Sequence, residues 1–416
     1  MKANDKLELS MRTTTSSDYQ TGMLPRRGAL RFVLLVGVLS FFADFTYEGS
    51  RSIAGPYLAS LGVGATLLGV IVGLGELLGY GLRVVSGRFA DATGWLWPTT
   101  IVGYTVQMCA VPLLALTHEW RSAAFLIVLE RVGKAIRNPP RDVMLSHAGE
   151  QLGGYGWAFG IHEALDQFGA MFGPMVMAIV LAAHNDYRLA FATLAIPAAV
   201  NLVCVLFARI TYPNPERFAE SAAPAPAQGR LPLAFWLYLA AAGLVAAGFA
   251  DYPLIAFHFA QTGLLTPHWV PMLYVIAMAS SGGASLLFGR LFDRYGFRVI
   301  VWLAALTWLY APLVWLGGVQ AAVVGAVLWG IGIGVHESVI PAAVAPLVDR
   351  RRRAFAYGLF TAGYGICWFL GSMVIGWAYD RHVAWTVLFC VLTQVLAIPI
   401  FIAAASRMQR SPADVD

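Results

Sequence analysis

Long apolar blocks alternate with short polar segments along almost the whole of this 416-residue chain. Each block is about twenty residues long, which is the length that an α-helix needs to cross the ~30 Å hydrocarbon core of a bilayer. The pattern therefore predicts an all-α membrane protein with twelve membrane-spanning helices. The predicted spans are 30–49, 64–86, 97–117, 122–145, 155–183 and 187–209, followed by 232–258, 267–288, 298–317, 319–346, 354–379 and 383–405.

The longest polar interruption after the N-terminus separates the first six spans from the last six. It reads TYPNPERFAESAAPAPAQGRLP and is rich in Pro and Ala, which is typical of a linker. We therefore predict two six-helix bundles joined by this segment. The predicted boundaries are a disordered cytoplasmic N-terminus at 1–28, a bundle at 29–210, the linker at 211–231, a second bundle at 232–405 and a cytoplasmic tail at 406–416.

Composition supports the membrane class, because 58% of the residues are hydrophobic and only 12% are charged. A soluble domain carries about 25% charged residues, so this chain has too little charge to cover a water-exposed surface. We attribute the net charge of +5 to membrane orientation and not to nucleic acid binding. The four cysteines all lie inside apolar blocks without metal-ligand spacing, so we interpret them as buried apolar side chains.

Most Lys and Arg residues outside the spans fall in the loops of one side of the membrane. Because cytoplasmic loops carry an excess of basic residues, both termini and the linker are predicted to be cytoplasmic. The protein is therefore expected in the cytoplasmic (inner) membrane as a multi-pass chain. The loops of the opposite side hold little basic charge beyond Arg51, Arg121, Arg188 and Arg381.

Two short segments repeat at an offset of 202 residues, since SGRFADATGW begins at residue 86 and FGRLFDRYGF at residue 288. Gly160 and Gly173 likewise recur as Gly358 and Gly371, at an offset of 198. Nearly equal offsets in separate segments indicate two related halves in parallel orientation, which is a transporter architecture. The matching positions of the short segments are Gly87, Arg88, Asp91 and Gly94 in the first half and Gly289, Arg290, Asp293 and Gly296 in the second.

This duplicated Gly-x-x-x-Asp-x-x-Gly loop resembles the signature loop of the major facilitator superfamily, as do the twelve spans and the central linker. The resemblance implies a secondary transporter that works by alternating access. It also implies that Arg88 and Asp91 lock the cytoplasmic side, with Arg290 and Asp293 as the second copy. The glycines are expected to turn the backbone tightly and to place Asp91 near the start of the next helix, where an anion is favoured. Simple anchoring by basic loop residues is the alternative interpretation of the arginines.

A stripe of charge runs along the fourth predicted span, within ERVGKAIRNPPRD. Glu130, Lys134, Arg137 and Arg141 follow one another at spacings of 4, 3 and 4 on one face, and Arg131 lies about a quarter turn away. A charge near the bilayer centre costs about 2.5–3.5 kcal/mol on insertion scales, so the stripe is expected to face protein or water. The Pro139–Pro140 pair is expected to bend or end the helix.

Other spans carry ionisable residues at similar depth, which predicts a shared central cavity. The resemblance implies that helices 1, 4, 7 and 10 line the central path. Ion pairs that only hold the helices together are the alternative. The sequence contains no His or Cys ligand set at metal spacing, so no metal site and no cofactor are predicted. The remaining candidate residues are Asp44, Glu48, His162, Glu163, Asp166, Asp251, His336 and Glu337.

The segment Gly169-x-x-x-Gly173-Pro174 resembles a motif of proton-coupled antiporters in this superfamily, although Met177-Ala178 replaces the usual small pair. A packing seam of small residues between helices is the alternative. The motif favours export without deciding it.

Proton coupling needs a carboxylate that loads and releases a proton near neutral pH, and Asp44 and Asp166 are the predicted carriers. We therefore predict proton-coupled export (antiport) of a small molecule. One alternative is proton-coupled uptake of an organic anion or a metal chelate, and another is a non-transporting membrane receptor or assembly partner.

The charges of the candidate residues leave the solute open. An excess of acidic groups suits a cationic or zwitterionic solute, whereas Lys134 and Arg137 would suit a carboxylate or a phosphate. The sequence shows no nucleophile–base set and no phosphate-binding loop, so an enzyme is not expected. The expected partners are the solute, protons and the lipid bilayer, without nucleic acid, and the chain is expected to be a monomer.

Overall fold

The computed structural model describes residues 26–152, 155–214, 231–348 and 352–409. Every regular element in these ranges is helical, and the predicted all-α membrane fold is confirmed. The first half comprises α2 (Arg26–Ser60), α3 (Ala65–Thr93), α4 (Leu96–Leu113), η1 (Leu114–Leu116), α5 (Trp120–Gln151), α6 (Tyr155–His184), α7 (Tyr187–Thr193) and α8 (Ala195–Thr211). The second half comprises α9 (Leu233–Ala247), α10 (Tyr252–Thr262), α11 (Trp269–Tyr295), α12 (Arg298–Thr307), α13 (Tyr310–Leu316), α14 (Val319–Glu337), α15 (Val339–Ala342), η3 (Ala345–Leu347), α16 (Arg353–Arg381) and α17 (Val383–Gln409).

Eleven helical stretches in the described ranges are long and apolar enough to cross a membrane. The remaining predicted span is α5, which has 32 residues and sufficient length but carries the charged stripe. The first span ends later than predicted, because α2 continues to Ser60 instead of stopping at residue 49. Its extra turns contain Arg51, which was expected in a loop and is instead buried among acidic partners.

The Pro139–Pro140 pair was predicted to bend or end the helix. It does not end α5, which continues to Gln151. Proline lacks the N–H that would bond to the carbonyl four residues earlier, and for Pro139 that carbonyl belongs to Ala135. The hydroxyl of Ser86 in α3 donates to this carbonyl oxygen at 2.8 Å. A side chain from the neighbouring helix therefore satisfies the group that the proline frees.

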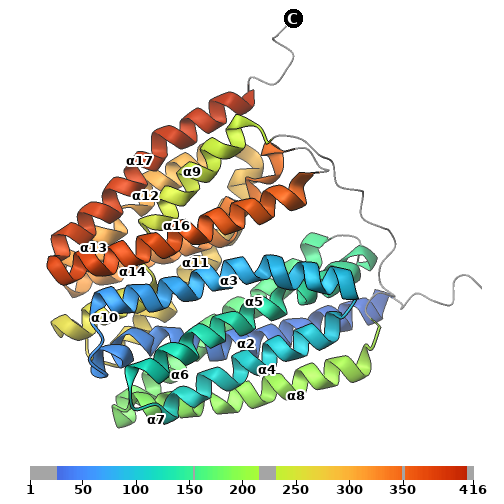
Figure 1. The fold of residues 1–416 in the computed structure, drawn as a ribbon, viewed down its shortest axis with the longest axis horizontal. Helices are drawn as coiled ribbons and strands as arrows, with labels where there is room; N and C mark the ends of the chain where they lie inside the picture. Colours follow the sequence, from blue (N-terminus) through green and yellow to red (C-terminus); the bar gives the residue numbers. More distant parts are fainter. Residues whose placement is uncertain (1–25, 153–154, 215–230, 349–351, 410–416) are drawn as a thin grey trace, which may run out of the picture.

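The long helices lie side by side in two groups, as Figure 1 shows, with the first half below and most of the second half above. We call the end at which α2 and α9 begin, and α8 and α17 finish, the linker end. The opposite end carries the turn between α2 and α3. The domain boundaries within this arrangement stay a prediction, and residues 1–25, 215–230 and 410–416 lie outside the described ranges.

Within each half, a duplicated glycine allows one close approach between helices. Gly173 of α6 packs against the backbone carbonyl of Phe45 in α2, where a Cβ would have no room. Its repeat partner, Gly371 of α16, packs in the same way against Ala247 at the end of α9. The internal repeat of the sequence therefore corresponds to equivalent helix contacts in the two halves.

Contacts between the two halves gather toward the opposite end. Gly55 of α2 lies against the carbonyl of Pro253 in α10, and Gly69 of α3 lies against that of Ser372 in α16. The carboxylate of Asp380 in α16 accepts from the backbone N–H of Ala65 and Thr66, at 3.1 and 2.8 Å, at the start of α3. At this end of the molecule, helices of the two halves are therefore in direct backbone contact, and Asp380 caps the start of α3.

The repeated Gly-x-x-x-Asp-x-x-Gly segments are the last turns of two helices at the linker end. Gly94 and Gly296 terminate α3 and α11 with φ values of 67° and 61°, which confirms the expected tight turns. Asp91 lies in the last turn of α3 instead of at the start of α4, so its predicted favourable position at a helix N-terminus is wrong. The side chains of Asp91 and Asp293 are outside the described part of the structure.

Candidate functional site

A cavity of ≈ 500 Å³ lies between the two halves. It reaches from Arg51 near the closed end to Gly160 and Pro341 toward the linker end. Its lining comes from α2, α3, α5, α6, α11 and α14 together with the segment that follows α14, so the second, fifth and eighth spans contribute besides the first, fourth and tenth. The seventh span provides none of the lining residues, contrary to expectation. The lining residues are Asp44, Glu48, Arg51, Tyr80, Arg83, Lys134, Asn138, Gly160, Glu163, Asp166, Gln167, Ala170, Met278, Ser285, Ile333, His336, Glu337, Ser338 and Pro341.

Asp44 and Lys134 meet at the wall of this cavity, as the predicted stripe requires. Oδ1 of Asp44 lies 3.9 Å from Nζ of Lys134 and 3.6 Å from Nη2 of Arg137. The Lys134 ammonium also lies 3.9 Å from the ring centre of Tyr47, where the negative face of the ring attracts a cation. Asp44 is therefore held by two cations of α5.

Three other residues of the predicted stripe or its edge do not line the cavity. Arg137 is fully buried, and its Nε donates to Oε1 of Gln107 in α4 at 2.5 Å. The amide nitrogen of Gln107 donates in turn to Glu130 at 2.7 Å. Glu130, Arg131 and Arg137, which were predicted to line the central cavity, therefore occupy the interfaces between α5 and its neighbours α3 and α4.

A buried ion-pair network closes the cavity at the opposite end. Arg51 pairs with Asp251 of the second half and lies 3.7 Å from Glu48 and 3.9 Å from Glu76. Arg131 reaches Glu76 at 2.7 Å. A network of this kind avoids leaving any single buried charge without a partner, which is costly in an apolar surrounding. Asp251, predicted as a cavity residue, belongs to this closure.

Two aromatic donors complete the closure from the second half. The hydroxyl of Tyr274 in α11 donates to Glu48 at 2.5 Å, and the indole N–H of Trp368 in α16 donates to Asp251 at 2.8 Å. Asp251 has no exposed surface. The closure therefore joins α2 to α10 and α11 through hydrogen-bonded charges.

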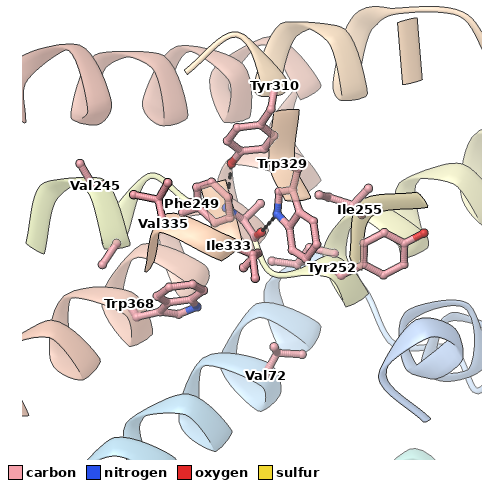
Figure 2. Packing of buried hydrophobic residues seen from close by; sticks show 14 of the residues in the cluster. Val72, Val245, Phe249, Tyr252, Ile255, Tyr310, Trp329, Ile333, Val335 and Trp368 are labelled. Atoms are coloured by element: carbon pink, nitrogen blue, oxygen red, sulfur yellow. Dashed lines mark hydrogen bonds between the residues drawn. The ribbon is translucent and has the colours of Figure 1, made fainter. Parts of the chain in front are cut away.

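Asp251 is available to Arg51 because the seventh span is broken. The helix stops at Ala247 and restarts at Tyr252. The Tyr310 hydroxyl donates to the carbonyl of Gly248 at 3.0 Å and accepts from the N–H of Ala250 at 2.7 Å, while Trp329 donates to the Ala250 carbonyl at 2.8 Å. Figure 2 shows Tyr310 and Trp329 reaching this break within a packed aromatic cluster. Non-helical backbone at membrane depth is tolerated where protein groups satisfy it in this way.

On α6, His162, Glu163 and Asp166 place their ligand atoms within 4.8 Å of one another. Nε2 of His162 is 2.6 Å from the hydroxyl of Ser40, which also accepts from Arg141 at 3.2 Å. We predicted no metal site from the sequence, but this grouping has the donor types of a divalent cation site. Because Ser40 and Arg141 already engage the His162 side of this group, we assign no metal to it.

The whole chain matches a known family. The model of the Major Facilitator Superfamily matches residues 33–266 and 252–415. The chain belongs to the Major Facilitator Superfamily. It is therefore a multi-pass membrane transporter of the secondary type and not an enzyme, and a small molecule is its expected substrate.

Individual relatives agree with this family. An uncharacterized protein of Mycobacterium tuberculosis is 38% identical over 385 residues, which cover 91% of this chain and 94% of the relative. A probable sugar efflux transporter of Haemophilus influenzae is 26% identical over 206 residues, which cover 48% of this chain and 50% of the relative. The crystal structure of the nucleoside transporter NupG, in a mutant form, matches with a TM-score of 0.69 at 15% identity and covers 91% of this chain and 99% of that chain. This last likeness shows the fold alone.

Several uncharged residues of this superfamily transporter contact the charged residues of the site. They were not predicted from the sequence. Gln107, Tyr274 and Ser40 each contact a charged candidate residue from another helix. A polar, uncharged residue in the middle of an apolar span was the available signal, since such groups need a partner in the membrane. Which partner each one has depends on helix packing.

Proposed function

We propose that this transporter exports a small molecule across the cytoplasmic membrane by alternating access, in exchange for protons. The cavity between the halves carries the proposal, because it is closed at one end by the Arg51–Asp251 network and extends toward the linker end. The bias of basic residues predicts that the linker end is cytoplasmic. With that orientation the cavity faces the cytoplasm, which is the side from which an exporter takes its solute.

Asp166 is the proposed proton carrier. It lines the cavity, and Oδ1 is buried without a hydrogen-bond partner in the described ranges. Oδ1 of Asp44, the other predicted carrier, also has no hydrogen-bond partner in the described ranges, but Lys134 and Arg137 lie 3.9 and 3.6 Å from it and favour its charged form. When Asp166 is protonated, its buried oxygen carries no charge. When the proton is released, Asp166 becomes a carboxylate that Lys134 of the same cavity can attract.

Two features support export, and not uptake, as the direction of transport. The glycine motif of α6 resembles that of proton-coupled antiporters, although its close packing on α2 also fits a plain packing seam. One relative is named a sugar efflux transporter and shares about half of its length with this chain. Uptake remains the alternative direction, and the test below separates the two.

The repeated segments at the linker end are proposed as the cytoplasmic gate. Arg88 and Arg290 are exposed there, as expected if the gate is open in this structure. Closure would bring each arginine toward acidic partners of the other helices. Asp91→Asn is expected to lower the transport rate without lowering the amount of protein in the membrane, and an unchanged rate would remove the gate from the proposal.

Alternating access is tested with spin labels on opposite halves of a chain in which the four native cysteines are replaced. Phe89→Cys and Phe355→Cys report on the linker end, and Leu116→Cys and Trp269→Cys report on the opposite end, because all four side chains are exposed. As the pH changes from 8 to 5, electron–electron resonance distances are expected to change in opposite senses at the two ends. Asp166→Asn is expected to abolish the response. Distances that stay fixed at both ends would refute the proposal.

Direction is tested in proteoliposomes by the sign of proton movement. An exporter that exchanges solute for protons moves protons opposite to the solute, whereas a symporter moves both the same way. A pH-sensitive dye inside the vesicles reads this sign when solute is added on one side. Movement in the same direction would replace export with uptake.

A further inference from the structure

The charged groups of the cavity divide into paired and unpaired sets. Two acidic residues of its wall already have basic partners, since Asp44 meets Lys134 and Glu48 lies 3.7 Å from Arg51. Three other carboxylates in the lining form no ion pair with any described residue, and these are Glu163, Asp166 and Glu337. The only basic lining residue outside the described ion pairs is Arg83, whose guanidinium lies 5.3 Å from the ring centre of Tyr80. The unpaired charge of the cavity is therefore acidic.

These carboxylates line the cavity from both halves. Glu163 and Asp166 lie on α6 of the first half, and Glu337 is the last residue of α14 in the second half. A ligand that contacts both groups would connect the halves that are proposed to move. Like charges across an empty gap repel, so a cation between them would favour approach of the halves.

Among the described residues of the cavity lining, unsatisfied acceptors outnumber unsatisfied donors. The acceptors are Oδ1 of Asp44, Asn138 and Asp166 and Oε1 of Gln167, and the donors are Nε of Arg51 and Arg83. Oδ1 of Asp166 and Oε1 of Gln167 are buried acceptors without a hydrogen-bond partner in the described ranges. The orientation of the Gln167 amide is set, because its nitrogen donates to Glu163 at 3.1 Å. Buried acceptors of this kind require a donor, so the missing partner carries N–H or O–H groups.

His336 adds a further unpartnered group on the second half. Only 8% of its surface is exposed, and it lines the cavity. Nδ1 lies 2.7 Å from the Tyr364 hydroxyl, whereas Nε2 has no partner among the described residues. The rings of Phe249 and Trp368 pack against the imidazole at 4.4 and 5.5 Å, and Tyr80 is the aromatic residue that lines the cavity itself. Aromatic faces attract cations and also pack against apolar groups.

We infer that the cavity binds an organic cation with an apolar body and an ammonium or guanidinium group. Its N–H groups donate to Asp166 and Gln167, and Glu163 and Glu337 balance its charge from the two halves. The cavity volume of ≈ 500 Å³ falls within the roughly 300–1,000 Å³ of small-molecule sites. This assignment names the solute class of the proposed transporter and rests on that proposed function.

The test compares three probes with the same apolar body, namely 4-phenylbutylamine, 4-phenylbutanol and 4-phenylbutyrate. Binding to the purified full-length protein in detergent is measured by calorimetry and by the thermal unfolding midpoint at pH 7.5. The ammonium probe is expected to bind at least tenfold more tightly than the alcohol, with no binding of the carboxylate. Equal or tighter binding of the carboxylate, or no binding of the amine at millimolar concentration, would overturn the inference.

Isosteric variants locate the site. Asp166→Asn and Glu337→Gln are each expected to weaken amine binding at least tenfold, whereas Glu119→Gln is expected to leave it unchanged. Glu119 is a matched control, since it lies in the loop before α5 at the opposite end, outside the cavity. Elution as a single species in gel filtration shows that a variant is folded. Amine binding that is unaffected by both cavity variants would place the cation elsewhere and contradict the inference.

Failure of this inference and failure of the proposed function give different results. If the spin labels show alternation but the amine does not bind, the solute class is wrong and the transport mechanism stands. If the amine binds and depends on Asp166 while the label distances stay fixed, the site is a cation site in a chain that does not alternate.

Discussion

Arg51 and Asp251 form an ion pair across 200 residues of sequence, and it joins the first helix of one half to the broken helix of the other. Both side chains are buried, and Arg51 keeps Glu48 and Glu76 within 4 Å. The pair therefore closes the cavity at the end away from the linker. The network supplies each of these buried charges with partners, which offsets the cost of burying them.

Asp251→Asn is expected to open this closed end. Breaking a buried pair by removing one partner destabilises by about 3–5 kcal/mol, although Glu48 and Glu76 will retain part of the Arg51 interaction. The labels at Leu116→Cys and Trp269→Cys should report a longer mean distance. The double variant Arg51→Gln with Asp251→Asn should not recover this stability, because it leaves the buried carboxylate of Glu48 without its basic partner. A single variant with unchanged distances and an unchanged unfolding midpoint would show that the pair does not hold the closure.

Ser86→Ala is expected to destabilise the protein by about 1–3 kcal/mol, because the carbonyl of Ala135 loses its donor beside Pro139. In a Pro139→Ala background, α5 regains its own N–H for this carbonyl and the effect of Ser86→Ala should shrink. A double-mutant cycle on thermal unfolding in detergent measures the difference. Ser146→Ala, which removes only a bond to the carbonyl three residues earlier, is the control. Equal effects of Ser86→Ala in both backgrounds would contradict the explanation.

Tyr310→Phe is expected to lower the unfolding midpoint, because the N–H of Ala250 loses its acceptor and the carbonyl of Gly248 keeps only the 3.3 Å bond from Gln394. An unsatisfied buried backbone group costs about 1–3 kcal/mol. Tyr295→Phe serves as the control, since this tyrosine is 42% exposed near the linker end. If both variants behaved alike, the hydroxyl would not be what stabilises the break.

Gly173→Ala and Gly371→Ala are expected to have similar effects, because each glycine lies against a backbone carbonyl of the first helix of its own half. The added Cβ would force α6 from α2, or α16 from α9, and should reduce the folded yield and the unfolding midpoint. Gly283→Ala is the control, since a Cβ there meets nothing within 4 Å. Tolerance of one of the two alanines would mean that the repeat is not equivalent in packing.

The candidate site was only partly readable from the sequence. The helical spacing of Glu130, Lys134 and Arg137 correctly excluded lipid from the stripe, yet only Lys134 of these three lines the cavity. Spacing of 3.6 residues places side chains on a face of their own helix but does not say which neighbour that face meets. Gln107, which forms hydrogen bonds with both Glu130 and Arg137, belongs to another helix, α4.

The sequence by itself determined the membrane class, the number of spans, the duplicated halves and the superfamily, because each of these depends on the length and composition of apolar blocks and on repeats along the chain. Tertiary structure alone decided that Arg51 meets Asp251 and that the seventh span is broken beside Asp251. A helix break at membrane depth is stable only when distant side chains, here Tyr310 and Trp329, satisfy its backbone groups. Such partners come together through the packing of helices, which local periodicity does not encode.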